Sequence, residues 1–248
     1  MDEKAAIKSL MELKEILDEY NVEYWLDCGT LLGAVREGKL IPWDKDIDLG
    51  VWYRDQSKML KAAEDFRRKG FLVNFFRNII SKKPSVYLAH VHHPDRDVFF
   101  NFNTYHADKK EAKIKFFIHL YFMKFAVLIN YLLSILSAPN HVGDTLKQIP
   151  YPVHRILIKI SLMIPDLLRP HIKKTLERLA VKLGCKYIQM VIPIRYFTNL
   201  SKIKFYGVEF KIPSQVEEYL TYRYGQDWKI PRREYVFYIE DGAIVGDE

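Results

Sequence analysis

The stretch Trp25–Val51, WLDCGTLLGAVREGKLIPWDKDIDLGV, decides both the fold and the candidate site. It begins within a short run of β-branched and aromatic residues, Val22–Cys28, which predicts a buried strand that ends at Gly29. Thr30–Arg36 follows at once with the character of a helix, and Thr30 is its candidate N-cap. The segment therefore predicts a strand, a Gly-Thr turn and a helix.

The end of this stretch alternates apolar residues with aspartates. Apolar positions from Ile47 to Val51 alternate with Asp46 and Asp48, the period of two that is typical of a strand with one face on a core. The two carboxylates therefore project from the same face, about 7 Å apart along the strand. Together with Asp44 they form a cluster of three carboxylates, which repel one another unless a cation neutralises them. This pattern suits a hard ion such as Mg²⁺ and predicts metal-assisted phosphoryl chemistry.

A phosphate site is expected just before the aspartates. At the start of the predicted helix, Gly29 and Thr30 offer free backbone N–H groups and a hydroxyl, which together can bind a phosphate. Arg36, at the end of the helix, can clamp a phosphate, but it can equally form a surface salt bridge or complement the helix dipole. For the aspartates the alternative is an ordinary polar loop with solvated carboxylates.

Helices and strands alternate around this stretch. Apolar residues at helical spacing predict one helix from about Asp2 to Tyr20 and another from Gln56 to Lys69. Three short strands are expected next, the last two joined by the turn HHPDRD: Phe71–Phe76, Val86–Val91 and Asp97–Phe102. This order predicts an α/β (α+β) fold in which a mixed sheet is covered by helices on one side.

Near the C-terminus, Phe205–Ile212 alternates like a strand, and Ser214–Tyr224 predicts a helix. Ser214 and Glu217 have the spacing of a capping box, and Gly225 is expected to end this helix. The sequence thus returns to mixed character after a different middle part.

Composition divides the chain into a core of residues 1–108, a helical basic insertion of residues 109–204, and residues 205–248, which complete the core. Between Lys109 and Lys204 there are 17 Lys and Arg against 4 Asp and Glu, whereas the remainder has 21 basic and 27 acidic residues. Ile114–Ala138 is strongly apolar but contains Lys124, so a buried helix, an interfacial membrane helix and a true span all stay open. Val153–Leu183 is expected to continue as helices. The basic middle is expected to attract polyanions such as lipid headgroups, unless it is merely a solvated surface.

Composition also excludes several classes of protein. The chain has 248 residues, of which 49% are hydrophobic and 14% aromatic, so it can bury a core and is not a disordered or low-complexity protein. Its two cysteines are too few for a disulfide framework, and no spacing suggests structural zinc. The charged N-terminal residues lack the apolar region of a secretory signal. A cytoplasmic location is therefore expected.

Two segments resemble the LicD family, which includes bacterial phosphocholine transferases and fukutin-type ribitol-phosphate transferases. The first is Trp25–Val51, and the second is FYGVEFKIPSQVEEYLTYRYGQDWKIP, Phe205–Pro231, which is similar to the closing pattern of the family. The likeness covers residues of about 20–105 and 205–231 and implies a nucleotidyltransferase-like fold. The basic middle matches no motif of the family.

The resemblance implies transfer of a phospho-alcohol, such as phosphocholine or ribitol phosphate, from a CDP-linked donor to a hydroxyl of a saccharide or lipid-linked glycan. It also implies Mg²⁺ or Mn²⁺ as cofactor. By position, Gly29 and Thr30 match the phosphate-contacting turn, and Asp46 and Asp48 match the metal-binding pair. Two further carboxylates complete the match: Asp44 of the PWD motif, and Asp97 as the third metal ligand on a later strand.

The catalytic residues expected on this basis are Asp44, Asp46 and Asp48, any of which can accept the proton of the attacking hydroxyl. The enzyme is expected at the inner face of the membrane, with peripheral contact to anionic lipid, and a nucleic-acid partner is not expected. Two other functions remain open. One is a nucleotidyltransferase that moves NMP from an NTP to a small molecule or sugar. The other is a non-catalytic protein that binds anionic polymers or membranes.

Overall fold

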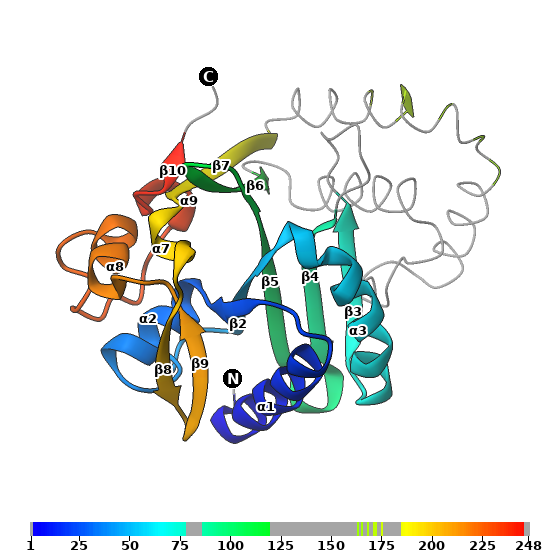
Figure 1. Cartoon of the computed structure of the whole chain (residues 1–248), viewed down its shortest axis with the longest axis horizontal. Helices are drawn as coiled ribbons and strands as arrows, with labels where there is room; N and C mark the ends of the chain where they lie inside the picture. Colours follow the sequence, from blue (N-terminus) through cyan, green and yellow to red (C-terminus); the bar gives the residue numbers. More distant parts are fainter. Residues whose placement is uncertain are drawn as a thin grey trace.

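The fold is described from a computed structural model. It describes residues 2–77, 86–119 and 185–245, together with the isolated positions 163, 165, 168, 171, 172 and 175. Figure 1 shows a twisted sheet with helices packed around it. The mixed α/β architecture expected from the sequence is confirmed.

Eight strands form the main sheet, in the order β1-β2-β5-β6-β7-β10, with β4 also paired to β5 and β3 paired to β4. β2 and β5 lie parallel, whereas the other pairs are antiparallel. The strands are β1 Tyr24–Leu26, β2 Asp46–Trp52, β3 Leu72–Arg77, β4 Val86–His93, β5 Val98–Ala107, β6 Glu111–His119, β7 Cys185–Pro193 and β10 Ile244–Val245.

The helices follow the expected order. α1 and α3 pack against each other beside the strands β3 to β5 (Figure 1). α2 follows β1 directly and lies against β2 and the separate hairpin of β8 and β9. The remaining bounds are α1 Glu3–Glu19, α2 Cys28–Arg36, α3 Gln56–Arg68, α7 Arg195–Thr198, β8 Ser201–Phe205, β9 Val208–Ile212, α8 Val216–Tyr224 and α9 Phe237–Glu240, with 3-10 turns at Tyr53–Asp55 and Pro94–Arg96.

One hydrophobic core lies between the sheet and these helices. The apolar face of α1, including Leu10 and Leu13, is fully buried, as the helical spacing predicts. In the sheet, Trp25 of β1 lies over Gly50 of β2, where any Cβ would collide with the indole ring. The carboxylates of β2 stand on the opposite face of the strand from its buried Ile47 and Leu49. The core therefore fixes which face of β2 the aspartates occupy.

Three local predictions near helices and turns are wrong. Asp27, and not Thr30, takes the N-cap position of α2, because the helix begins at Cys28. Ser214 does not form a capping box: its hydroxyl donates to backbone oxygens of α7, and α8 begins only at Val216. The segment Phe205–Ile212 is not one strand, since a tight turn separates β8 from β9.

The apolar middle also differs from its prediction where it is described. Ile114 begins no helix but lies inside β6, which pairs with β7 along its whole length. The residues 120–138, and nearly all of Val153–Leu183, lie outside the described residues, so the insertion of residues 109–204 stays a prediction. Its described parts include β6 and β7 of the main sheet, the short helix α7 and most of β8, which belongs to the separate hairpin. No helix within the described residues has the length and apolar character that a membrane span requires.

Candidate active site

The turn between β1 and α2 is fastened to β2 at Asp48. The backbone N–H of Asp27 donates to the carbonyl oxygen of Asp48 at 3.1 Å. The N–H of Asp48 in turn donates to Oγ1 of Thr30 at 2.8 Å. Thr30 is 1% exposed and is not among the residues that line the cavity described below, so its hydroxyl positions β2. The structure therefore places Thr30 behind the site, and contact of its side chain with a phosphate stays a prediction.

Asp46 and Asp48 lie on one face of β2, as the alternation predicts. In the parallel pairing, Asp48 stands beside Asn101 of β5. The Nδ2 group of Asn101 donates to Oδ2 of Asp46 at 2.6 Å and to Oδ1 of Asp48 at 3.1 Å. The two carboxylates are thus bridged by an amide from the neighbouring strand.

Asp44 approaches the same site from the loop before β2. Its backbone N–H donates to Ile41, and its Oδ1 accepts from the N–H of Lys45 at 2.9 Å. Its Oδ2 lies so close to Gly29 that a Cβ at this position would collide with it. Glycine is therefore needed here for the close approach, and the carboxylate gains from the positive end of the α2 dipole.

The electrostatics of the cluster favour a cation. Burial, followed by the negative charge of Asp46, raises the pKa of Asp44 to about 6. Burial also raises the pKa of Asp48 well above its usual range, and the charges of Asp46, Asp27 and Asp44 act in the same direction. A bound cation would remove this penalty by neutralising the carboxylates.

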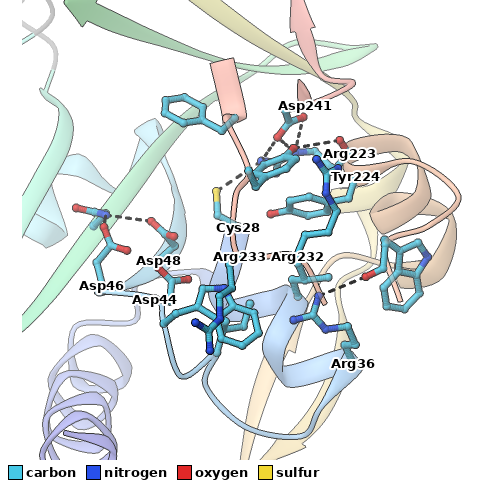
Figure 2. Close-up of a pocket in the computed structure, with 18 of the residues that line it drawn as sticks. Cys28, Arg36, Asp44, Asp46, Asp48, Arg223, Tyr224, Arg232, Arg233 and Asp241 are labelled. Carbon is cyan, nitrogen blue, oxygen red and sulfur yellow. Dashed lines mark hydrogen bonds and ion pairs between the residues drawn. The ribbon is translucent and has the colours of Figure 1, made fainter. Parts of the chain in front are cut away.

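The three aspartates line a cavity of about 440 Å³. We call Gly29, Asp44, Asp46, Asp48 and Asn101 the acidic wall. The opposite side, which we call the C-terminal wall, comes from residues 223–241 (Figure 2). It includes Arg223, Trp228, Arg232, Arg233, Tyr235 and Phe237.

A buried ion-pair network joins the two walls. Arg223 is 2% exposed, and its guanidinium forms an ion pair with Asp241 at 2.6 Å. Its Nη1 lies 3.6 Å from Oδ1 of Asp27, the residue that precedes α2. Asp27 also accepts hydrogen bonds from Tyr105 and Asn103 of β5, at 2.8 and 3.0 Å. The C-terminal wall is thus tied to both the helix and the strand that build the acidic wall.

Arg36 lines the cavity from the end of α2. Its guanidinium forms an ion pair with Glu37 at 2.6 Å and donates to the carbonyl oxygen of Trp228 at 3.5 Å. The salt bridge is not on the surface, because the Arg36 side chain is 7% exposed, and Arg36 also lies in the last turn of α2, where its charge complements the helix dipole. Arg36 therefore links α2 to the C-terminal wall, and phosphate binding by it stays a prediction.

Two further arginines face the cavity that sequence reasoning did not single out. Arg232 forms an ion pair with Glu240 at 2.6 Å, and the guanidinium carbon of Arg233 lies 5.6 Å from the ring centroid of Trp43. Trp43 is 37% exposed. In the sequence, these two arginines directly follow Trp228–Pro231, the end of the segment that resembles the family. Only the fold shows that they line the cavity opposite the aspartates.

The structure does not bring Asp97 to the other aspartates. Asp97 lies in the turn before β5, its side chain is 88% exposed, and Nε2 of His92 lies 3.7 Å from its Oδ1. It does not line the cavity. Among the residues that the structure describes, no three His, Cys, Asp or Glu side chains are grouped so that they could hold a metal ion. The polar groups that meet at this place are the carboxylates of Asp46 and Asp48 and the amide of Asn101, whose Nδ2 faces them, with Asp44 beside them.

Comparison with known proteins shows which family this chain resembles. Residues 21–129 match the family model described as "LicD/FKTN/FKRP, nucleotidyltransferase domain". The chain is 30% identical to protein RP689 of Rickettsia prowazekii over 100 residues, which cover 40% of this chain and 38% of that protein. It is 47% identical to human ribitol 5-phosphate transferase FKRP over 51 residues, which cover 20% of this chain and 10% of that protein.

A third relative matches over most of its length. The lipopolysaccharide cholinephosphotransferase LicD of Haemophilus influenzae is 21% identical over 256 residues, covering 88% of this chain and 87% of that protein. By contrast, the chain spans 38% and 10% of the other two relatives. The resemblance to the LicD family is confirmed, and residues 21–129 are the part of this chain that matches its nucleotidyltransferase domain.

Proposed function

We propose that this protein is a metal-dependent phosphotransferase that moves a phospho-alcohol from a CDP-linked donor to a hydroxyl of a glycan. The observation that carries the proposal is a single cavity with Asp46 and Asp48 on one wall and Arg232 and Arg233 on the other. To bind a nucleoside diphosphate together with a divalent cation, the carboxylates of one wall would hold the cation and the arginines of the other would contact phosphate oxygens. The match to phosphotransferases of the LicD family supports the same reaction class.

The donor set of the acidic wall fits Mg²⁺ or Mn²⁺. Asp46 and Asp48 present carboxylate oxygens on one strand face, and these hard ligands suit such ions. Burial, and after it the charges of Asp46, Asp27 and Asp44, raise the pKa of Asp48, and a bound divalent ion would offset this cost of ionisation. When bound, such an ion supplies charge neutralisation for the diphosphate and for the leaving CMP.

Other side chains of the cavity are suited to proton transfer and to binding of the donor. Asp44, whose pKa is raised to about 6, is suited to accept the proton of the attacking hydroxyl near neutral pH. Arg232 and Arg233 are suited to bind phosphate oxygens of the donor, and Trp43 offers a ring face for its nucleobase. Holding the acceptor hydroxyl close to the phosphorus of the donor in the cavity would supply much of the rate enhancement over the uncatalysed reaction.

The partners follow from this assignment. The donor is a CDP-linked alcohol, and the acceptor is a saccharide, either free or linked to lipid. Location at the inner face of the membrane and contact with anionic lipid remain proposals, since most of the basic middle lies outside the described residues.

A donor screen tests the proposal. The protein is incubated with Mg²⁺, an oligosaccharide acceptor and CDP-choline, CDP-ribitol or CDP-glycerol in turn, and CMP release is measured. We expect CMP from at least one donor, and none from the Asp46→Ala variant. Pyrophosphate release from an NTP would instead identify a nucleotidyltransferase. No product, combined with no change in melting temperature on adding Mg²⁺ and CDP, would indicate a non-catalytic protein.

A further inference from the structure

Asn101 occupies the place on β5 that faces the two aspartates of β2. β5 runs parallel to β2, and the register sets Asn101 directly beside Asp48. Because side chains alternate along a strand, Asn101 and Asn103 share a face, while Phe100 and Phe102 point into the core. Asp97 lies four residues earlier, in an exposed turn. The strand therefore presents an amide where the sequence had suggested a third carboxylate.

The amide of Asn101 donates hydrogen bonds to both carboxylates. Among the described residues, its side chain has no other hydrogen bond. Its Nδ2 donates at 2.6 Å to Asp46 and at 3.1 Å to Asp48. Asn103, the next residue on this face, donates instead to Asp27 and Cys28, so it serves the buried network. Within the described residues, Asn101 is the side chain of β5 that hydrogen-bonds to the aspartates of the acidic wall.

An amide can serve two opposite electrostatic needs. Its NH₂ end carries two donors, which reduce the repulsion between two carboxylates, and its oxygen end is an acceptor that can ligate a cation. A half-turn of the terminal amide exchanges these two ends without moving the backbone, since this torsion is broad and roughly two-fold.

We propose that Asn101 is the third protein ligand of the divalent ion. Its side-chain amide rotates by a half-turn between an ion-free state and an ion-bound state. This inference rests on the proposed function, because it takes the ion as given. In the ion-free state Nδ2 bridges Asp46 and Asp48, as observed. In the ion-bound state Oδ1 faces the ion that those carboxylates hold.

The neutral ligand sets the charge of the site. The two carboxylates that Asn101 bridges, Asp46 and Asp48, carry at most two negative charges, which one divalent ion balances. A carboxylate in place of Asn101 would add a further negative charge to a wall that already includes Asp44. The observed site should therefore bind its ion less tightly than a site of three carboxylates. It should also be more stable without the ion, because the amide replaces part of the missing positive charge.

The test is Mn²⁺ binding by the full chain without substrate, measured by the paramagnetic resonance of free Mn²⁺. Asn101→Leu, which removes both ends of the amide, should weaken Mn²⁺ binding by about tenfold or more. Asn101→Asp, which is nearly isosteric, should tighten it by about tenfold or more and lower the melting temperature in EDTA. The matched control is Asp97→Asn, since Asn tolerates the left-handed backbone at this position. It should bind Mn²⁺ as the wild type does.

Two kinds of failure can be told apart. If the wild type binds Mn²⁺ but both Asn101 variants bind it equally well, the third-ligand assignment is overturned while the proposed function stands. If the wild type binds no Mn²⁺, the metal of the proposed function fails and this inference fails with it. Should Asn101→Leu not fold, the Asn101→Asp result decides alone, and binding no tighter than wild type contradicts the proposal.

Discussion

The two walls of the cavity are built in different ways. Nearly all of the acidic wall comes from one stretch of 20 residues, Gly29–Asp48, whose strand geometry alone puts Asp46 and Asp48 on one face. The C-terminal wall comes from residues 223–241, almost 200 positions later, and is held in place by the buried Arg223. Repulsion between carboxylates destabilises the acidic wall, whereas ion pairs stabilise the C-terminal wall.

This difference separates function from stability. Removing a charge from the acidic wall should harm activity without harming the fold, because the carboxylates repel one another. Removing the buried charge of the C-terminal wall should harm the fold itself. Four substitutions test this contrast.

Asp48→Asn should lower CMP release by at least about a thousandfold, the order lost when a key electrostatic group leaves a site. The melting temperature in EDTA should stay the same or rise, because a buried negative charge next to Asp46 is removed. Activity assays and thermal denaturation check the two effects. The control Asp97→Asn should change neither, and a large loss of stability in Asp48→Asn would contradict the contrast.

Arg223→Met should destabilise the fold by about 3–5 kcal/mol, because it leaves Asp241 and Asp27 buried without their cation. Urea denaturation measures this change in the free energy of unfolding. The matched control is Lys202→Met, which removes an exposed ion pair with Glu209 and should cost less than about 1 kcal/mol. Equal effects of the two substitutions would show that the network does not hold the C-terminal wall.

Thr30→Val tests the joint between α2 and β2. It keeps the shape of the side chain but leaves the buried N–H of Asp48 without its acceptor, which should cost about 1–3 kcal/mol. Thr30→Ser retains the hydroxyl and should cost less. The same denaturation experiment measures both, and a Val variant as stable as the Ser variant would show that the hydrogen bond contributes nothing.

Arg233→Ala should weaken CDP binding in the presence of Mg²⁺ by about tenfold, as expected when one charge-assisted hydrogen bond of about 1.5 kcal/mol is lost. The free energy of unfolding should barely change, since Arg233 is exposed. Calorimetric titration with CDP measures the affinity. Arg68→Ala, which removes an exposed arginine of α3, is the control, and an equal loss in both variants would refute a specific role.

Much of the fold was predictable because its signals are local. The spacing of apolar residues gave α1 and α3, and the alternation around Asp46 gave the correct face of β2. The turn between β8 and β9 was missed, although Gly207, with φ of 82°, was its signal. The helical prediction is wrong for Ile114–His119, because a continuous apolar run fits a buried strand as well as a helix, and the rest of that prediction lies outside the described residues.

The rest of the site depended on long-range register. Asp97 was expected as a metal ligand only because its position matches the pattern of the family. Nothing near Asn101 in the sequence shows that it stands beside Asp48. The same holds for Arg223, which pairs with Asp27 only after the C-terminal residues fold back onto α2. Contacts between segments that are far apart in the sequence form only in the completed fold, and they produce no periodic pattern in the sequence that could predict them.

The most direct test of the account is a crystal structure with Mn²⁺ and CDP, in which anomalous scattering locates the ion. We predict one Mn²⁺ peak at Asp46, Asp48 and Asn101, with the diphosphate of CDP between that ion and Arg232 or Arg233. An ion bound elsewhere, or CDP bound outside the cavity while the amide of Asn101 still bridges the two aspartates, would contradict it.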